Sequence, residues 1–122
     1  MFFTQKFDKI LMNKIKAIIL FFEGKYMGEI RQKDMIIKII AMLIPEARIY
    51  LFGSYARQQP KIGSDIDIAV DASRRLTLAE LKNAIRLIGA LPIAQRVDVV
   101  DFHRVPEGMR KSILAEGILW KK

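Results

Sequence analysis

Residues 53–67 read Gly-Ser-Tyr-Ala-Arg-Gln-Gln-Pro-Lys-Ile-Gly-Ser-Asp-Ile-Asp, and the fold of the chain is decided around this stretch. The β-prone run at 48–52 leads into it and stops at a glycine, as a strand entering a turn does. After it, Ile66, Ile68 and Val70 alternate with acidic or small residues, which is the period-2 pattern of a strand with one apolar face. The sequence therefore predicts two strands joined by a polar connection.

Two acids end this connection. Asp65 and Asp67 stand two residues apart at the start of the second predicted strand. Residues at this spacing point to the same side of a sheet, so the two carboxylates repel each other unless they meet solvent or a cation. Mg²⁺ prefers oxygen ligands and is held by one or two carboxylates together with substrate phosphates. Taken alone, such a pair is more typical of a solvent-facing strand than of a metal site.

The residues before the acids change that interpretation. Gly53 and Ser54 stand where the first strand gives way to a predicted short helix. Glycine lets the backbone approach a phosphate closely, and the free N–H groups at a helix start attract anions. Ser54 can cap the helix or offer its hydroxyl to a phosphate, and Arg57 can add a guanidinium one turn later. The alternative is an ordinary turn with a capping serine.

A third acid, Asp98, lies between Val97 and Val99 in another run that reads as a strand. A carboxylate flanked by apolar strand residues is unusual unless it pairs or binds something. If its strand neighbours that of Asp65 and Asp67, three carboxylates converge. A two-metal site for phosphoryl-type transfer needs such a set of acids.

The spacing of Gly-Ser, ten further residues and Asp-x-Asp resembles the signature of the DNA polymerase β type of nucleotidyltransferase. Residues 53–70 look more narrowly like the minimal nucleotidyltransferases, the MNT family. The resemblance continues through 96–102 and the closing 113–120, and it covers about residues 29–120. It implies the polymerase β-like nucleotidyltransferase fold.

The resemblance also implies roles for individual residues. The nucleotide would be bound by Gly53, Ser54, Arg57 and Ser64, and two Mg²⁺ ions by the catalytic carboxylates Asp65, Asp67 and Asp98. In the family a glycine often follows the arginine that matches Arg57, whereas this chain has Gln58. The resemblance therefore does not fix the conformation of this loop.

By the same resemblance, the chain forms an oligomer with a small helical HEPN toxin. It would act as the antitoxin by transferring AMP from ATP to a tyrosine of the toxin. Two alternatives stay open: a non-catalytic antitoxin that neutralises its partner by complex formation, and a protein that binds nucleic acid directly. Direct nucleic-acid binding is suggested by the positive charge alone, because the sequence has no nucleic-acid-reading motif and no alternation of basic and aromatic residues. We therefore do not expect it.

The remaining pattern predicts an α+β fold, a two-layer arrangement in which helices flank a small mixed sheet. Helical spacing and chain breakers predict helices at 29–44, 76–88 and 106–116, and β-prone alternation predicts a third strand at 96–101. Thr77 and Glu80 predict a capping box at the start of the second of these helices. Residues 118–120, after Gly117, read as a short apolar tail.

Composition narrows the function classes. The 122 residues, 52% of them hydrophobic and 28% charged, suit one globular domain. The absence of cysteine excludes a disulfide scaffold, a Cys-based zinc site and a thiol nucleophile, and it fits a cytoplasmic protein. The formal charge of +8 favours an acidic partner such as nucleotide phosphates.

Residues 1–26 form a leader before the domain expected at 27–122. Its longest uninterrupted apolar run has six residues, too short for a signal peptide or a membrane span, so we expect no membrane association through a span. One interpretation is an amphipathic helix. The other is a mis-assigned start, because Glu23-Gly24 can be encoded by a purine-rich string just before the Met27 codon, as in a ribosome-binding site.

Overall fold

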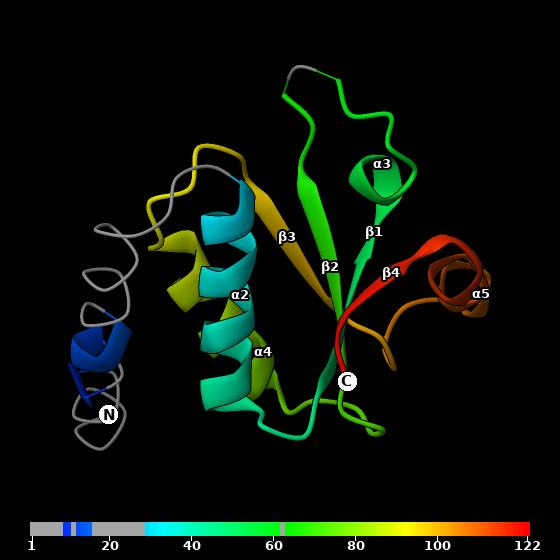
Figure 1. Cartoon of the computed structure of the whole chain (residues 1–122). Coiled ribbons are helices and arrows are strands. Elements are labelled where there is room, and N and C mark those ends of the chain that lie inside the picture. Colours follow the sequence, from blue (N-terminus) through cyan, green and yellow to red (C-terminus); the bar gives the residue numbers. More distant parts are fainter. Residues whose placement is uncertain (1–8, 11, 16–28, 62) are drawn as a thin grey trace.

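The computed structural model describes residues 9, 10, 12–15, 29–61 and 63–122 (Figure 1). In chain order its helices and strands are α2 (Glu29–Leu43), β1 (Arg48–Phe52), α3 (Gly53–Ala56), β2 (Ile66–Asp71), α4 (Leu78–Gly89), β3 (Val97–Asp101), α5 (Glu107–Glu116) and β4 (Ile118–Lys121). The predicted α+β class is confirmed, and each predicted helix and strand is present within a few residues of its expected bounds.

The four strands form one mixed sheet in the order β3-β2-β1-β4. β1 pairs antiparallel with both β2 and β4, whereas β2 and β3 are parallel. The chain passes from β2 to β3 through α4, because a parallel pair needs a crossover and cannot be joined by a hairpin. The apolar tail predicted after Gly117 is in fact the edge strand β4, which pairs with the middle of β1.

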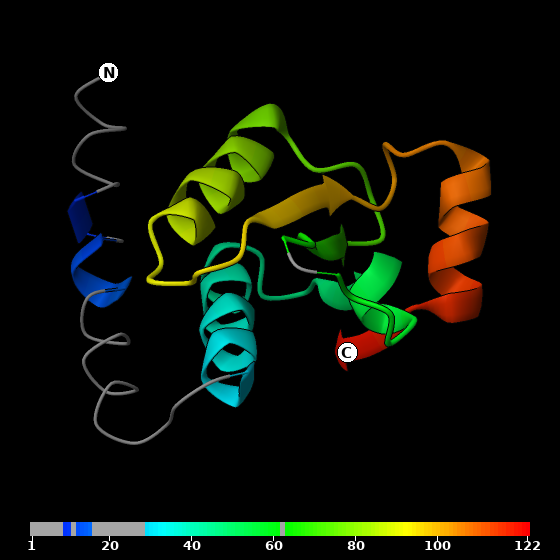
Figure 2. The ribbon, with the colours of Figure 1, turned by 90° about the horizontal axis from the view of Figure 1, so that it is seen from above.

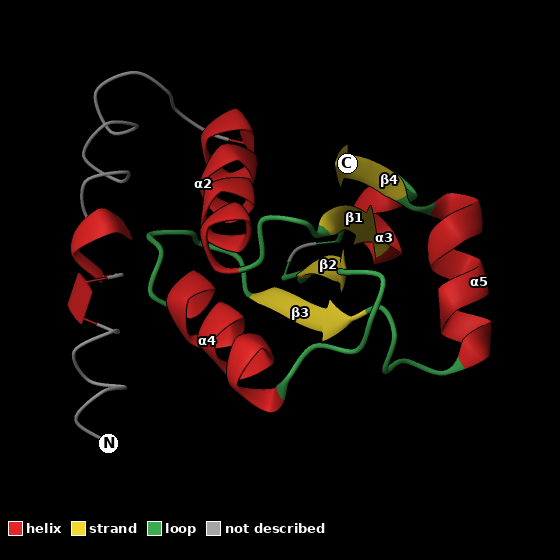
Figure 3. Ribbon diagram, turned by 90° about the horizontal axis from the view of Figure 1, so that it is seen from below, coloured by secondary structure: helices red, strands yellow, loops and turns green. Residues whose placement is uncertain are grey.

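Helices cover the two faces of the sheet unequally. α2 and α4 lie against one face, and α5 lies on the other (Figures 2 and 3). The main core fills the space beneath α2 and α4, where alternate strand residues such as Ile49, Ile66 and Ile68 are buried. A smaller cluster around Ile113 holds α5 on the opposite face, which we call the open face. That face also carries Asp67, because its neighbours Ile66 and Ile68 point into the core.

The capping box predicted at α4 is present. The Thr77 hydroxyl accepts a hydrogen bond from the Glu80 backbone N–H (3.1 Å), and the Glu80 carboxylate accepts one from the Thr77 N–H (2.8 Å). Arg74 donates to the same carboxylate and lowers the pKa of Glu80 to about 2. The helix begins at Leu78, two residues later than predicted, because Thr77 has the extended backbone of an N-cap residue (φ −68°, ψ 157°).

Gly117 allows α5 to end against β1. A Cβ at this position would collide with the carbonyl oxygen of Ile113 and would lie 3.3 Å from that of Leu51. The backbone N–H of Gly117 donates to the same Ile113 carbonyl (2.8 Å). Only glycine permits this close approach, so it fixes where α5 stops and β4 starts.

Part of the leader packs on the domain. Residues 9, 10 and 12–15 are helical, Ile15 is buried in the main core with 1% of its surface exposed, and Met12 packs against that core. Lys9 and Lys14 are exposed, as in an amphipathic helix. The rest of the 1–26 leader lies outside the described residues. Among the described helices, none has the length and apolar character needed to cross a bilayer.

We expect Ile15→Ala to lower the free energy of unfolding by about 2–4 kcal/mol, because it removes a fully buried side chain. The matched control is Ile10→Ala, since Ile10 is 49% exposed and its truncation should cost little. Urea unfolding of the 122-residue protein measures both. Equal, small effects of the two substitutions would mean that the leader does not pack on the domain in solution.

Candidate active site

Gly53 joins the loop that follows β1 to the strand that carries the acids. Its φ is +73°, a conformation that favours glycine, and a Cβ there would collide with Oδ2 of Asp67. The contact arises because Phe52 is the register partner of Asp67 in the β1–β2 pair. The backbone of Gly53 therefore lies directly beside the Asp67 carboxylate, as expected of a loop that lets a phosphate approach a metal ligand.

The charges of Asp98 and Asp65 both act on Asp67. Asp98 is the register partner of Asp67 in the parallel β2–β3 pair, so the two side chains leave the same face of adjacent strands. Burial raises the pKa of Asp67, and the charges of Asp98 and then Asp65 raise it further. Arg57 opposes this by lowering the pKa of Asp67. The convergence predicted for the three acids gains support from this coupling.

The donor set fits a hard divalent cation. It offers only carboxylate oxygens, and repulsion among them is relieved when a cation binds. Among the described residues, no three acidic, histidine or cysteine side chains already form a metal-binding cluster. Such a site needs further ligands, and phosphate oxygens of a nucleotide held at Gly53 would lie in the right place to supply them.

The remaining predicted nucleotide contacts have different surroundings. Ser54 does not cap α3, because the cap position belongs to Phe52, which makes no side-chain hydrogen bond. Of the two roles left open for Ser54, the capping role is therefore excluded. The Ser64 hydroxyl accepts a hydrogen bond from the Lys61 backbone N–H (2.7 Å) and so stabilises its own loop. Arg57 lies half-exposed at the end of α3, 3.5 Å from the Glu116 carboxylate. Whether these three side chains contact a nucleotide remains a prediction.

Four further polar residues lie at the carboxyl ends of β2 and β3, away from the acids of the site. Asp101 faces away from Asp98 and is buried, accepting hydrogen bonds from the N–H groups of Leu76 and His103 and pairing with Arg104 (3.2 Å). His103 contacts Asp71 through Nε2 at 2.7 Å. These hydrogen bonds and ion pairs connect the loops that follow β2 and β3, so we assign the residues a structural role and no role in the candidate active site.

The residues of α5 beside Gly53 carry no functional signal in the sequence. A groove of about 360 Å³ lies between this helix and the β1–α3 junction. Met109, Ser112 and Glu116 line it from α5, together with Gly53 and Arg57 from the loop. Their spacing of three and four residues puts them on one helix face, a signal that becomes visible only once α5 is known to lie on the open face.

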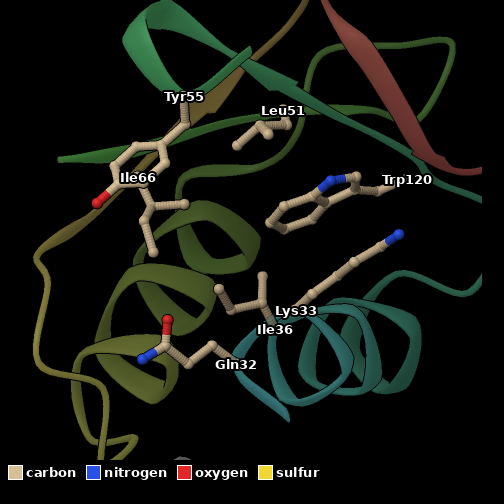
Figure 4. Close-up of a pocket in the computed structure, with 7 residues that line it drawn as sticks. All are labelled: Gln32, Lys33, Ile36, Leu51, Tyr55, Ile66 and Trp120. Carbon is tan, nitrogen blue, oxygen red and sulfur yellow. The ribbon is translucent and has the colours of Figure 1, made fainter. Parts of the chain in front are cut away.

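A second hollow, of about 270 Å³, lies on the α2 side of the sheet (Figure 4). Its walls include Ile36 of α2, Leu51 of β1 and Trp120 of β4, and Lys33 approaches the Trp120 ring with its Nζ 5.8 Å from the ring centroid. None of the predicted site residues lines it. The sheet separates it from the Asp67 carboxylate, so the predicted chemistry belongs to the open face.

The raised pKa of Asp67 predicts that its ionised carboxylate lowers the stability of the metal-free protein, whereas a bound cation restores it. An acid whose pKa is raised by folding lowers the free energy of unfolding when it is ionised. This loss is absent below the ordinary pKa of 3.8 and reaches its full size above the raised pKa. We therefore expect metal-free Asp67→Asn to be more stable than the unmodified protein at pH 7 and equal to it near about pH 3.

Urea unfolding with EDTA measures this difference, and added Mg²⁺ should stabilise the unmodified protein but not the variant. Glu107→Gln is the control, because that side chain is 74% exposed and outside the site. A metal-free Asp67→Asn that is less stable at pH 7 would contradict the proposed cause of the pKa shift.

Gln58 has a φ of +57°, so the position at which the resemblance favours glycine does adopt a left-handed conformation. We expect Gln58→Gly to raise the free energy of unfolding by up to about 1 kcal/mol, and Gln58→Val to lower it by about 1–2 kcal/mol. Gln59→Gly, one residue later, should only destabilise. Identical effects of glycine and valine at position 58 would refute the left-handed conformation.

Comparison with solved structures finds toxin–antitoxin complexes. One, solved with AMP-PNP, is 29% identical and covers 72% of this chain and 71% of its own, with a TM-score of 0.63. A chain of a mutant MntA–HpeT complex is 30% identical, with a TM-score of 0.60, and the match covers 70% of this chain and 68% of that one. A third match is to the complex of a tri-AMPylated Shewanella oneidensis HEPN toxin with MNT antitoxin. The identity is 28% and the TM-score 0.58, and the match covers 73% of this chain and 68% of that one.

Among proteins of curated function, none matches this sequence significantly. The family model described as "Polymerase beta, Nucleotidyltransferase" matches residues 35–121, which include Gly53 and all three carboxylates. The match spans well over half of the chain and includes all four strands of the sheet. This chain belongs to the polymerase β-type nucleotidyltransferase family.

Proposed function

We propose that this protein is an antitoxin that transfers AMP from ATP to a tyrosine hydroxyl of a HEPN-type toxin, using Mg²⁺. The observation that carries the proposal is the contact between Gly53 and the Asp67 carboxylate, with Asp98 beside it on the next strand. Support also comes from similar proteins, one solved with AMP-PNP and one bound to an AMPylated HEPN toxin. The absence of cysteine fits a cytoplasmic setting for the reaction.

Each residue has a part in the transfer. Gly53 brings backbone N–H groups close to the phosphates, and Ser54 can add its hydroxyl. Asp65, Asp67 and Asp98 would hold Mg²⁺, which when bound offsets phosphate charge and lowers the pKa of the acceptor hydroxyl. All three carboxylates offer hard oxygen ligands, and those of Asp67 and Asp98 lie on the open face of the sheet.

The position of β3 at the edge of the described sheet suits an acceptor that approaches from outside the sheet. Asp98 lies on β3, and in our proposal the acceptor tyrosine enters from that side while the phosphates lie toward α3. The tyrosine oxygen forms a bond to the α-phosphorus, the bond to the bridging oxygen of pyrophosphate breaks, and the hydroxyl proton passes to an Asp98 carboxylate oxygen. Pyrophosphate leaves and AMP stays on the toxin.

Labelled ATP, Mg²⁺ and the partner HEPN protein test the proposal. We expect label on the toxin with the unmodified antitoxin, and at least about a thousand-fold slower transfer with Asp65→Ala plus Asp67→Ala, because charge stabilisation at the phosphate is lost. Glu107→Gln, on the exposed face of α5, should retain the full rate.

Transfer that survives the double substitution would overturn the catalytic role of these carboxylates. If the unmodified protein transfers no label but the doubly substituted antitoxin still protects cells from the toxin, neutralisation by complex formation is the function instead. Protection that is lost together with transfer supports the enzyme.

A further inference from the structure

The hollow of Figure 4 lies beside a strand edge that pairs with no other described strand. Trp120, one of its walls, belongs to β4, and β4 is the last strand on its side of the sheet. Ile118 is the register partner of Leu51, another wall residue, so Ile118 faces the same side of the sheet as the hollow. Because Ile118 is 42% exposed, the apolar surface continues from the hollow along the strand.

The size and walls of the hollow suit one large side chain. Its volume of about 270 Å³ lies below the range of about 300–1,000 Å³ that is typical of sites for drug-sized ligands. Ile36, Leu51 and Ile66 give it apolar walls, together with the rings of Tyr55 and Trp120 (Figure 4). Pockets of this kind at protein interfaces receive an aromatic anchor from the partner.

The charges near the hollow are positive. Lys33 is the charged side chain among the described residues that line it, and its Nζ lies 5.8 Å from the centroid of the Trp120 ring. β4 ends at Lys121, Lys122 follows, and residues 117–122 include no acid. A second copy of the chain would bring the same positive charges to this edge, whereas carboxylates would be attracted to it. Charge complementarity therefore favours an acidic partner over self-association.

We propose that β4 and the hollow together bind an extended, acidic segment of a partner protein. The segment pairs its backbone with the outer edge of β4, places one aromatic side chain in the hollow against Trp120, and sets a carboxylate beside Lys33. In strand addition of this kind, main-chain hydrogen bonds supply affinity and a pocket for a side chain supplies specificity. The docked segment does not depend on the proposed transfer, because β4 and β3 are opposite edges of the described sheet and the β3 side stays free for the acceptor.

A display library of random eight-residue peptides without tryptophan, selected on the 122-residue protein, tests the proposal. We expect the selected peptides to share one Phe or Tyr with an Asp or Glu within two residues of it. Trp120 is the only tryptophan of the chain, so its fluorescence reports when a selected peptide enters the hollow and gives the dissociation constant. A selection that yields no such shared pattern would overturn the proposal.

Substitutions on α2 and α4 locate the bound peptide. Gln32→Trp fills the hollow and should weaken binding about tenfold or more, whereas Lys38→Trp, exposed on the same helix and outside the hollow, should change it less than about twofold. Lys33→Glu should weaken binding about tenfold at low salt and less at high salt, whereas the same charge reversal at the exposed Lys82 of α4 should have little effect. Equal effects within either pair would place the peptide elsewhere and refute the assignment.

The addition of a strand has a separate readout. N-methylation of a selected peptide at every second residue removes the backbone donors of one edge only. We expect methylation of the edge that faces β4 to weaken binding about tenfold or more, and methylation of the other edge to change it less than about twofold. Equal losses for the two edges would mean that the peptide does not extend the sheet.

Sedimentation without peptide distinguishes a second copy of the chain as the occupant. We expect the unmodified protein and Gln32→Trp to sediment identically. An unmodified protein that forms a dimer, which Gln32→Trp dissociates, would assign the hollow to self-association and overturn the proposal.

Discussion

The space beside Gly53 is the constraint on which the site depends. Asp67 occupies the volume that any other residue at position 53 would need for its Cβ, and the backbone there is left-handed as well. The close approach of Asp67 arises because the β1–β2 register sets Phe52, the residue before Gly53, opposite Asp67. The antiparallel pairing of two strands thus fixes how near the Gly53 backbone comes to the Asp67 carboxylate, and a one-residue slip would send Asp67 into the core.

Much of this arrangement can be predicted from the sequence. The alternation of Ile66, Ile68 and Val70 with the acids places Asp67 on the face away from the core, and the structure has it there. The capping box at Thr77 was also predictable, because it depends on residues three apart along the chain. Both are local patterns, which need no knowledge of what lies across the sheet.

The rest depends on pairing that local pattern cannot reveal. Asp98 lies beside Asp67 because β2 and β3 pair in parallel. From the sequence alone, this proximity could be predicted only if the two strands were assumed to be neighbours. β4 was missed because four residues, two of them exposed, give little strand signal until they pair with β1. The groove residues of α5 were missed for a related reason: their place beside Gly53 requires the helix to lie on the open face, which Gly117 and the cluster around Ile113 determine.

The edge strand β4 also bears on how the protein avoids aggregation. Ile118 and Leu119 are each 42% exposed on β4, whose outer edge pairs with no other described strand, and such an edge invites a second chain to extend the sheet. Two features work against it: the register shifts at Ile49/Tyr50, which disturbs the regular ladder, and Lys121 puts a charge at the end of the strand. Its ammonium donates hydrogen bonds to the carbonyls of Pro45 and Ala47, which hold the charge at the end of β4 beside the start of β1.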